Sequence, residues 1–284
     1  MTAAPGKIVV VKVGGDILLD DEERQGLGTN IRQLVDAGHP VIVLHGGGPQ
    51  VSALQEKLGM TPKKVGGRRV TSTEDLRVVQ QAICGEVNVA LTSTLLQAGV
   101  RAFGCHGASG EMVQATKRPP KVVAEGGDEP VDFGEVGDVV HIDAELIRGL
   151  LDLSLVPVVA TLGVTPGQGR VFNINADTTA TRLAQALGAG ALLLVTKIGG
   201  VYRELSKPET RYERLDAAEA RSLIEAGIIA GGMIPKVEEA IEVLEQGVSA
   251  IAVVGAREPD SFLSVVRNEG AFGTRIAAEI SRSA

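Results

Sequence analysis

Short runs of β-branched and aliphatic residues alternate along this chain with longer stretches in which apolar residues recur every three or four positions. The short runs are typical of strands covered on both faces, and the longer stretches are typical of amphipathic helices. The predicted strands span residues 8–13, 41–44, 100–104, 155–161, 192–196 and 250–254. This alternation predicts an α/β fold whose mainly parallel sheet lies between helix layers.

Three stretches show the helical period most clearly. Two of the predicted apolar faces are formed by Leu27, Ile31, Leu34 and Val35, and by Val51, Leu54 and Leu58. The third stretch, residues 72–97, reads as one long helix that opens with Thr71 and Glu74 as a capping box and has a site for a kink at Gly85. Helices of this length fit between the predicted strands as crossover connections.

Residues 118–143 break the rhythm of strands and helices. Their sequence, RPPKVVAEGGDEPVDFGEVGDVVHID, predicts hairpins with glycine turns, inserted into the α/β pattern as a lid. Neither a repeat of solenoid period nor a low-complexity linker is visible in the sequence. We therefore expect residues 1–284 to form a single domain.

Lys12 stands in the middle of an otherwise apolar predicted strand, IVVVKV. Burying an ammonium group is costly unless an anionic partner compensates its charge. Lys12 therefore requires a partner from elsewhere in the chain.

Glycine clusters occur beside several predicted strands and helices, and ligands of open α/β sheets bind at the carboxyl ends of the strands. The clusters are Gly14-Gly15, Gly46-Gly47-Gly48 before Pro49, and Gly231-Gly232 before Pro235. A proline at a helix start leaves backbone N–H groups directed out of the helix end, where glycines let an anion approach. A tight strand-to-helix turn without a ligand is the alternative reading.

Lys236 falls in the first turn of a predicted helix, where the helix dipole disfavours a cation. A side chain extended into solvent is one explanation, but Lys12 and Lys236 together would suit a bound polyanion such as a phosphate chain. Asn173, Asn175 and Asp177 lie between a strand and a helix, where Asp177 either caps the helix or holds the lysines.

Two arginines, Arg68 and Arg69, lie in the loop before the long helix. Arginine binds carboxylates through paired hydrogen bonds, although a solvated loop arginine is the more common case.

The formal net charge of −7 and the pI of about 5.3 argue against a nucleic-acid or anionic-membrane binder, because no basic stripe is present. No apolar run approaches the roughly 20 residues that span a bilayer, and the start MTAAPGK lacks a hydrophobic signal region. We therefore expect a cytoplasmic protein with a small-molecule partner. Cys84 and Cys105 are too few for a disulfide framework.

Several catalytic classes lack their motifs in this sequence. There is no GxxxxGK[ST] phosphate loop and no GxSxG nucleophile elbow, and the GQG at residue 167 precedes a strand rather than following one. The histidines are His39, His45, His106 and His141, and their spacing matches no metal site. We therefore expect no metal site built by protein side chains.

The ordered segments VVVKVGG, VIVLHGGGPQV, GGRRVTS, FNINADTTA, LLLVTKIGGVY and IIAGGMIPKVEEA resemble the amino acid kinase family, and within it the members that phosphorylate N-acetyl-L-glutamate. The resemblance runs from about Ile8 to Ile276. It implies a three-layer αβα sandwich with an open, mainly parallel eight-stranded sheet. It also implies an N-terminal lobe, 1–172, for dimerisation and the acyl amino acid, and a C-terminal lobe, 173–284, for ATP.

By this resemblance, Lys12 and Lys236 act on the transferred phosphoryl group and Asp177 organises both. The acyl amino acid would be bound by Gly46, Gly47, Arg69 and Asn173, with the RVT that follows Arg68 selecting Arg69. ATP would be bound by Gly14, Gly15, Thr196, Lys197, Tyr202, Gly232 and Met233. Mg²⁺ would be held mainly by phosphate oxygens and water.

The resemblance also implies a homodimer that arginine does not inhibit. Arginine-sensitive members carry an additional N-terminal helix, whereas only seven residues precede Ile8 here. They also carry a histidine and a glutamate before a TDEGxGT-like turn, where this chain reads EPDSFLSVVRNEGAFGT. Elsewhere HGASGEM replaces an SGxDG-like turn and TKIGGVY replaces the common TDVPGV.

Three other functions remain open at this point. A kinase for a carrier-linked aminoadipate or glutamate would need a basic surface for an acidic carrier. A non-catalytic amino-acid or nucleotide sensor on the same fold would not need Lys12, Asp177 and Lys236 together. A purely structural subunit would not need the glycine turns.

Overall fold

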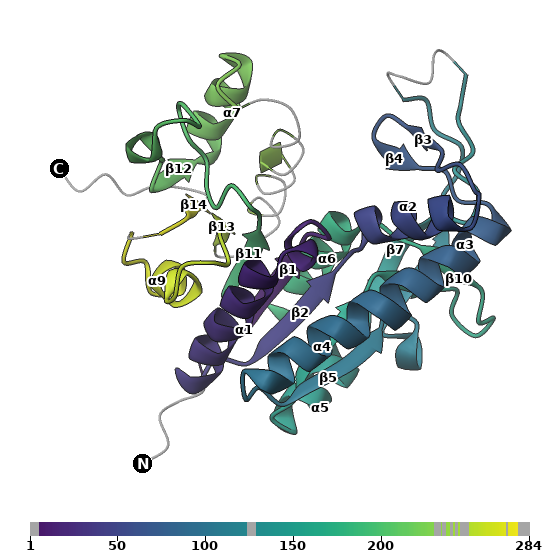
Figure 1. Ribbon diagram of the computed structural model, residues 1–284, viewed down its shortest axis with the longest axis horizontal. Coiled ribbons are helices and arrows are strands. Elements are labelled where there is room, and N and C mark those ends of the chain that lie inside the picture. The colour runs from purple at the N-terminus through teal and green to yellow at the C-terminus, as the bar shows by residue number, and fades with distance from the viewer. Residues whose placement is uncertain are drawn as a thin grey trace.

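An eight-stranded sheet forms the centre of the computed structural model, in the order β12-β14-β13-β11-β1-β2-β8-β5 (Figure 1). The structure describes residues 6–123, 129–229, 250–270 and 272–277 and positions 234, 237, 238, 241 and 244. The strands are β1 (Val9–Val13), β2 (Val41–His45), β5 (Ala102–His106), β8 (Val156–Ala160), β11 (Ala191–Val195), β12 (Arg214–Asp216), β13 (Ile251–Val254) and β14 (Thr274–Ala277).

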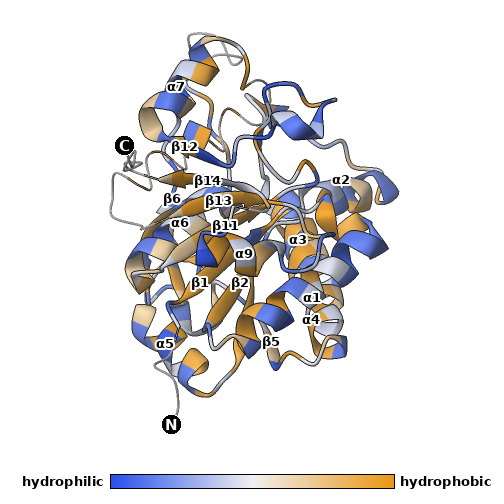
Figure 2. Cartoon of the chain, turned by 90° about the vertical axis from the view of Figure 1, so that its left-hand side faces the viewer, coloured by the Kyte–Doolittle hydropathy of each residue, from blue (hydrophilic) through white to orange (hydrophobic). Residues whose placement is uncertain are grey.

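Every pair of neighbouring strands in this sheet is parallel except β13 and β14, which run antiparallel. The central strands β1, β2, β8, β11 and β13 are buried along their whole length. Figure 2 shows the apolar colouring of the sheet's strands. Burial on both faces explains why these strands appear in the sequence as continuous apolar runs. The mainly parallel, eight-stranded sheet is confirmed.

Helices cover both faces of the sheet and complete the three layers. Val9, Val11 and Val13 pack with residues of α1 (Asp21–Asp36), α4 (Asn88–Gln97) and α9 (Ser261–Arg267). Val10 packs on the opposite side with residues of α5 (Ala144–Asp152), α6 (Ala176–Leu187) and α7 (Ala217–Glu225). Because side chains alternate along a strand, Lys12 shares the face of Val10 and points to the α6 side.

The predicted long helix is one continuous helical segment with an irregular centre. It comprises α3 (Thr73–Gln80), a π-helical segment (Gln81–Val87) that contains Gly85, and α4. The predicted capping box at Thr71 and Glu74 is wrong by one residue, since Ser72 and Asp75 form it. Thr71 is buried, and its backbone is instead hydrogen-bonded to residues 133 and 135.

A second, four-stranded sheet has the order β10-β9-β6-β7 and includes one flank of the predicted insertion. Its strands are β6 (Val113–Lys117), β7 (Gly137–Ile142), β9 (Leu162–Val164) and β10 (Val171–Asn173). The hairpin predicted within residues 118–143 begins earlier than expected, because β7 pairs with β6, which ends at Lys117. Inside the predicted segment, Lys121 forms a single β-bridge with Val131. Residues 124–128 lie outside the described chain.

The remaining short elements lie at the edges of the layers. They are α2 (Gly48–Lys57), the hairpin of β3 (Lys64–Val65) and β4 (Arg68–Arg69), and 3-10 turns at Ile17–Leu19, Ser109–Glu111 and Pro208–Thr210. The strand predicted at residues 100–104 begins two residues later, at Ala102. Leu58, predicted to share an apolar helix face with Val51 and Leu54, is 55% exposed and follows the last residue of α2, Lys57.

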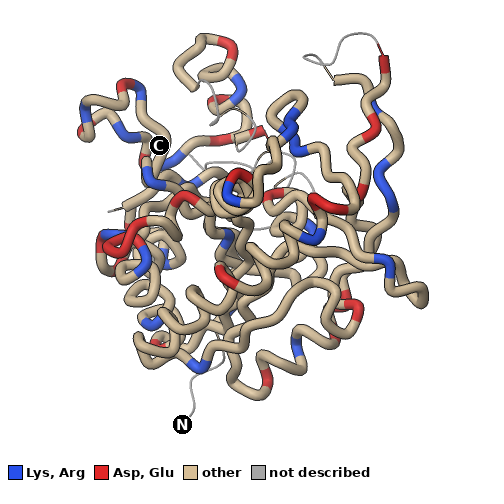
Figure 3. The backbone as a smooth tube through the Cα atoms, turned by 45° about the vertical axis from the view of Figure 1, so that its right-hand side comes forward, with Lys and Arg blue, Asp and Glu red and all other residues tan. Residues whose placement is uncertain are grey.

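Basic and acidic residues are interspersed along the chain (Figure 3). None of the described helices has the length and apolarity that crossing a membrane requires.

Candidate active site

Lys12 forms an ion pair with Asp177. Its side chain is 9% exposed, and its Nζ lies 2.5 Å from Oδ1 of Asp177 in the first turn of α6. The N-cap of α6 is Asn175, whose side chain accepts a hydrogen bond from the N–H of Thr178 at 2.8 Å. Asn175 rather than Asp177 caps the helix. The carboxylate of Asp177 therefore pairs with the buried ammonium of Lys12 near the end of β1.

Two glycine turns lie against each other beside this ion pair. A Cβ atom on Gly15 would lie 3.1 Å from Cα of Gly47 and 2.8 Å from Oε1 of Gln50, so the site admits only glycine. The side chain of Gln50 also donates from Nε2 to the carbonyl of Gly15 at 2.7 Å. The turn that follows β1 is thereby attached to the turn that follows β2.

Gly47 is the N-cap of α2, and a Cβ atom there would lie 2.8 Å from Cγ2 of Ile83 in the π-helical segment. The carbonyl of Gly47 accepts from the N–H of Val51 and so starts the helix. The first N–H groups of a helix have no acceptor within it. The Gly46-Gly47-Gly48 turn therefore presents backbone donors suited to an anion.

His45, at the end of β2, is buried behind this turn. Its Nδ1 lies 2.8 Å from the carbonyl oxygen of Gly46, and its Nε2 lies 2.9 Å from Nδ2 of Asn88. Burial lowers the pKa of His45 to about 4, so the ring is neutral at physiological pH.

An open pocket of about 230 Å³, here called the substrate pocket, lies in front of the glycine turn. The predicted residues Gly46, Gly47, Arg69 and Asn173 all line it. Its apolar wall includes Val51, Val79 and Ile83, and three arginines, Arg68, Arg69 and Arg118, also line it. Among the described residues, none of those lining it is an aspartate or glutamate.

Arg69 is held at this pocket by a network of hydrogen bonds. Its guanidinium donates to the carbonyl of Gly48 at 3.1 Å, to Oγ of Ser52 at 2.8 Å and to the buried side chain of Gln55, which in turn donates to Asp75. Burial lowers the pKa of Arg69, partly offset by the charge of Asp75. Arg68 is exposed, so the geometry favours Arg69 as the ordered cation.

Arg118, which the sequence reasoning missed, is the third pocket arginine. Its Nη2 lies 2.7 Å from Asp138, and its guanidinium lies 5.9 Å from the centre of the Phe133 ring. Its signal in the sequence was its position at the start of the predicted insertion.

A second pocket of about 230 Å³, here called the C-terminal pocket, lies beyond the end of β11. Lys197 and Tyr202 line it, while Thr196 is buried and accepts a hydrogen bond from the N–H of Gly199 at 3.1 Å. Gly14 and Gly15 lie instead at the turn beside Gln50. Gly232, Met233 and Lys236 lie outside the described residues.

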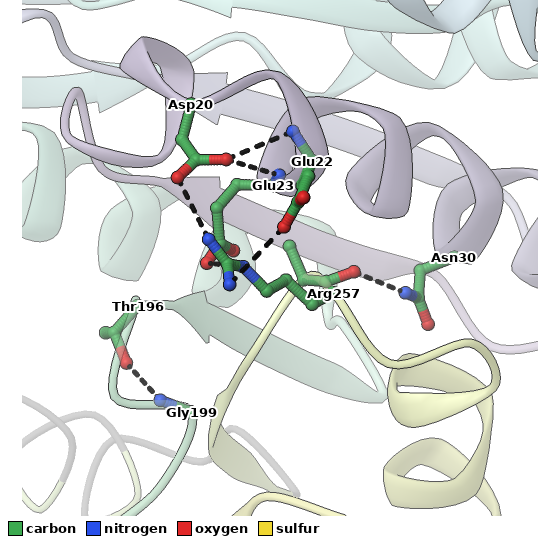
Figure 4. Close-up of polar contacts among 8 residues, drawn as sticks. Asp20, Glu22, Glu23, Asn30, Thr196, Gly199 and Arg257 are labelled. Atoms are coloured by element: carbon green, nitrogen blue, oxygen red, sulfur yellow. Dashed lines mark hydrogen bonds and ion pairs between the residues drawn. The ribbon is translucent and has the colours of Figure 1, made fainter.

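Arg257 attaches the C-terminal pocket to the start of α1, as Figure 4 shows. Its guanidinium lies 2.9 Å from Asp20, 2.8 Å from Glu23 and 3.5 Å from Glu22. Glu23 is 3% exposed, and its burial raises its carboxyl pKa despite the nearby Arg257. Asn30 of α1 adds a hydrogen bond to the carbonyl of Ala256 at 3.0 Å. This cluster could not be predicted from the sequence, because acidic residues are ordinary in a first helical turn.

Over the described part of the chain, no group of three or more His, Cys, Asp or Glu side chains is placed to hold a metal ion. Cys84 and Cys105 are free thiols, and burial raises their pKa values to about 11 and about 12.

Comparisons with known proteins show the family of the chain. The model of the amino acid kinase family matches residues 7–255. An acetylglutamate kinase of Anaeromyxobacter dehalogenans is 44% identical over 94% of this chain and 98% of its own length, and one of Methanocaldococcus jannaschii is 36% identical over 96% and 91%.

One similar solved structure is that of N-acetylglutamate synthase from Neisseria gonorrhoeae, complexed with coenzyme A and N-acetyl-glutamate. The TM-score is 0.80 and the sequence identity 26%, and the match covers 97% of this chain and 60% of the synthase chain. Giardia carbamate kinase, at 18% identity, has a TM-score of 0.68 over 97% and 100% and shares the fold. The chain belongs to the amino acid kinase family.

Proposed function

We propose that this protein transfers the γ-phosphoryl group of ATP to the γ-carboxylate of N-acetyl-L-glutamate, forming N-acetyl-L-glutamyl 5-phosphate in arginine biosynthesis. The observation that carries the proposal is the ion pair of buried Lys12 with partly exposed Asp177, together with an arginine-lined pocket. The names of the relatives support the same reaction.

The charges of the substrate pocket favour an N-acylated dicarboxylate over a free amino acid. Arg68, Arg69 and Arg118 supply positive charge, and no described lining residue supplies the carboxylate that a free α-ammonium group would need. Burying an unpaired ammonium among three guanidinium groups would be unfavourable. An acetamido group removes that charge, and its methyl fits the apolar wall of Val79 and Ile83.

Each pocket residue has a distinct role in this proposal. The N–H groups of the Gly46-Gly47 turn hold the γ-carboxylate, Arg69 binds the α-carboxylate, and Asn173 binds the acetamido group or the same carboxylate. Asn173 is positioned by a hydrogen bond from its Nδ2 to Oγ1 of Thr71 at 3.2 Å. Both ends of a dicarboxylate thereby meet donors, which fixes its orientation.

Phosphoryl transfer requires positioning and charge neutralisation rather than covalent catalysis. Lys12 stabilises negative charge on the transferred group, and Asp177 holds the ammonium in place. Lys236 is assigned the corresponding role from the other side of the phosphoryl group. The attacking γ-carboxylate is ionised at neutral pH, so no general base is needed.

The nucleotide would be held by Gly14, Gly15, Thr196, Lys197 and Tyr202, with Gly232 and Met233 assigned by resemblance alone. Mg²⁺ would neutralise phosphate charge while being held mainly by phosphate oxygens and water.

We further propose a homodimer formed through the N-terminal half of the chain, 1–172, with the C-terminal half, 173–284, binding ATP. Val89 and Leu96 of α4 and Phe103 of β5 are exposed apolar residues, and β5 is an edge strand of the main sheet. Such a surface favours self-association. Light scattering tests it: a dimer mass is expected, and a monomer mass would contradict it.

The activity is tested by trapping the acyl phosphate with hydroxylamine in a coupled ATPase assay. N-acetyl-L-glutamate is compared with free glutamate, aspartate, carbamate, UMP and a carrier-linked aminoadipate. Hydroxamate formation is expected with N-acetyl-L-glutamate. Turnover of free glutamate at equal efficiency, or of the carrier-linked substrate alone, would contradict the proposal.

A further inference from the structure

The hydrogen bonds of His45 determine which ring nitrogen carries its proton. The carbonyl oxygen of Gly46, 2.8 Å from Nδ1, can only accept a hydrogen bond, so Nδ1 must be the protonated nitrogen of a neutral ring. Nε2 is then an acceptor, and Nδ2 of Asn88 donates to it at 2.9 Å. Both nitrogens of this fully buried imidazole are thus satisfied.

Asn88 ties the imidazole to the main sheet. The two hydrogens of its Nδ2 are shared among three acceptors, which are Nε2 of His45, the carbonyl of Val158 in β8 at 2.8 Å and the carbonyl of Cys105 in β5 at 3.1 Å. Asn88 follows the π-helical segment directly, and the same segment places Ile83 against Gly47. The ring is therefore fixed by two strands and a helix, all outside the substrate pocket.

The bond from Nδ1 also orients the peptide that joins Gly46 to Gly47. In a trans peptide the C=O and N–H point in opposite directions, so a carbonyl directed at His45 turns the N–H of Gly47 away from the ring, toward the substrate pocket that both glycines line. Glycine on both sides makes rotation of this peptide unusually easy. A rotated peptide would present its carbonyl oxygen to the substrate and repel a carboxylate.

We propose that His45 is a positioning residue, which holds the Gly46-Gly47 peptide with its N–H directed at the γ-carboxylate of the substrate. The identity of that carboxylate rests on the function proposed above, whereas the orientation of the peptide does not. Because burial lowers the pKa of His45 to about 4, its neutral form and this orientation persist throughout the neutral range.

Two substitutions separate this role from mere packing. In His45→Asn the amide nitrogen can occupy the position of Nδ1, whereas in His45→Gln the longer side chain places its amide near Nε2 and loses the bond to Gly46. We expect His45→Gln to raise the KM for N-acetyl-L-glutamate at least about tenfold, the effect of losing a charge-assisted donor. His45→Asn should stay within about threefold, and the KM for ATP within about twofold, in both variants.

Equal KM values for N-acetyl-L-glutamate in the two variants, or changes that only follow thermal stability, would overturn the proposal. Long-range ¹H–¹⁵N NMR of the unaltered protein gives a readout independent of activity. A proton on Nδ1 of His45 is expected between about pH 5.5 and 8, and a proton on Nε2 would overturn the proposal even if both variants fail to fold. Failure of the unaltered protein to phosphorylate N-acetyl-L-glutamate would instead count against the proposed function.

Discussion

The substrate pocket and the C-terminal pocket have similar volumes, but the charged residues that line them differ in sign. Three arginines line the first without a described carboxylate, whereas Lys197, Arg211 and Arg257 line the second together with Glu23 and Glu258. Tyr202 and Phe272 add aromatic surface only to the second. The carboxylates that pair with Arg118 or lie near Arg69, Asp138 and Asp75, are not part of the first pocket's lining. A lining that carries only positive charge favours anionic ligands, whereas a lining that carries both signs selects by shape and hydrogen bonding.

This contrast separates the two ends of the proposed reaction. We expect a dicarboxylate to gain binding free energy from the arginines of the first pocket. The uncharged nucleoside part of ATP should bind in the second pocket without a large electrostatic cost. The strand that carries Lys12, β1, lies between β2, which leads to the first pocket, and β11, which leads to the second. Substitutions in the three regions should therefore change different kinetic constants.

The largest effect is expected between the pockets, from Lys12→Ala. Loss of its charge should lower kcat at least about a hundredfold, comparable with removing one oxyanion donor, and change KM values less. Lys236→Ala should behave alike. Steady-state kinetics measures this, with exposed Lys57→Ala as the control. Near-normal turnover in Lys12→Ala would contradict the assigned mechanism.

Arg69→Ala should affect the substrate pocket alone. We expect the KM for N-acetyl-L-glutamate to rise roughly ten- to a hundredfold with kcat largely kept, because a substrate clamp acts on ground and transition states alike. Exposed Arg68→Ala is the matched control and should be mild. If the two arginines exchange their effects, the assignment within this loop is wrong.

The converse effect is expected in the C-terminal pocket. Lys197→Ala and Tyr202→Ala should raise the KM for ATP about fivefold and leave that for N-acetyl-L-glutamate unchanged, because each supplies one partly exposed contact. Isothermal titration with an ATP analogue would show the same separation. An unchanged ATP affinity in both variants would place the nucleoside elsewhere.

The smallest effect concerns the neutral histidine behind the substrate pocket. The pKa of His45 is about 4 when folded and about 6.5 when unfolded, so protons favour the unfolded chain as the pH falls below 6.5. Between pH 7 and pH 5.5 this linkage should remove about 1 kcal/mol of unfolding free energy. Urea unfolding of wild type and His45→Asn should differ in this pH dependence, and parallel curves would contradict the burial of a neutral ring.

The central strands were predictable because they are buried on both faces and therefore apolar throughout. The short strands at one end of the sheet, β12 and β14, were not, since Arg214–Asp216 and Thr274–Ala277 have few residues and only part of each is buried. The capping residue of α3 was misplaced because Thr71 and Ser72 are chemically alike. Only the pairing of Thr71 with residues 133 and 135 decides between them.

In the site, the need of Lys12 for an anion was predictable because a lysine inside an apolar strand requires one, whereas the choice of Asp177 over a capping role came from the family resemblance. His45, Gln55 and Arg118 were not, because each depends on a partner distant in sequence, such as Asn88 or Asp138. A polar residue whose partner is distant cannot be distinguished by its local pattern from an exposed one.

The position of β1 has a consequence for how the chain folds. On one side β1 pairs with β2, which follows it closely, but on the other it pairs with β11, some 180 residues later. Closing so long a loop is slow, and until then β1 presents an open edge of buried valines. Asp177 is also synthesised long after Lys12, so their ion pair forms late. The proposed catalytic pair and protection from aggregation should therefore arise at the same late stage of synthesis.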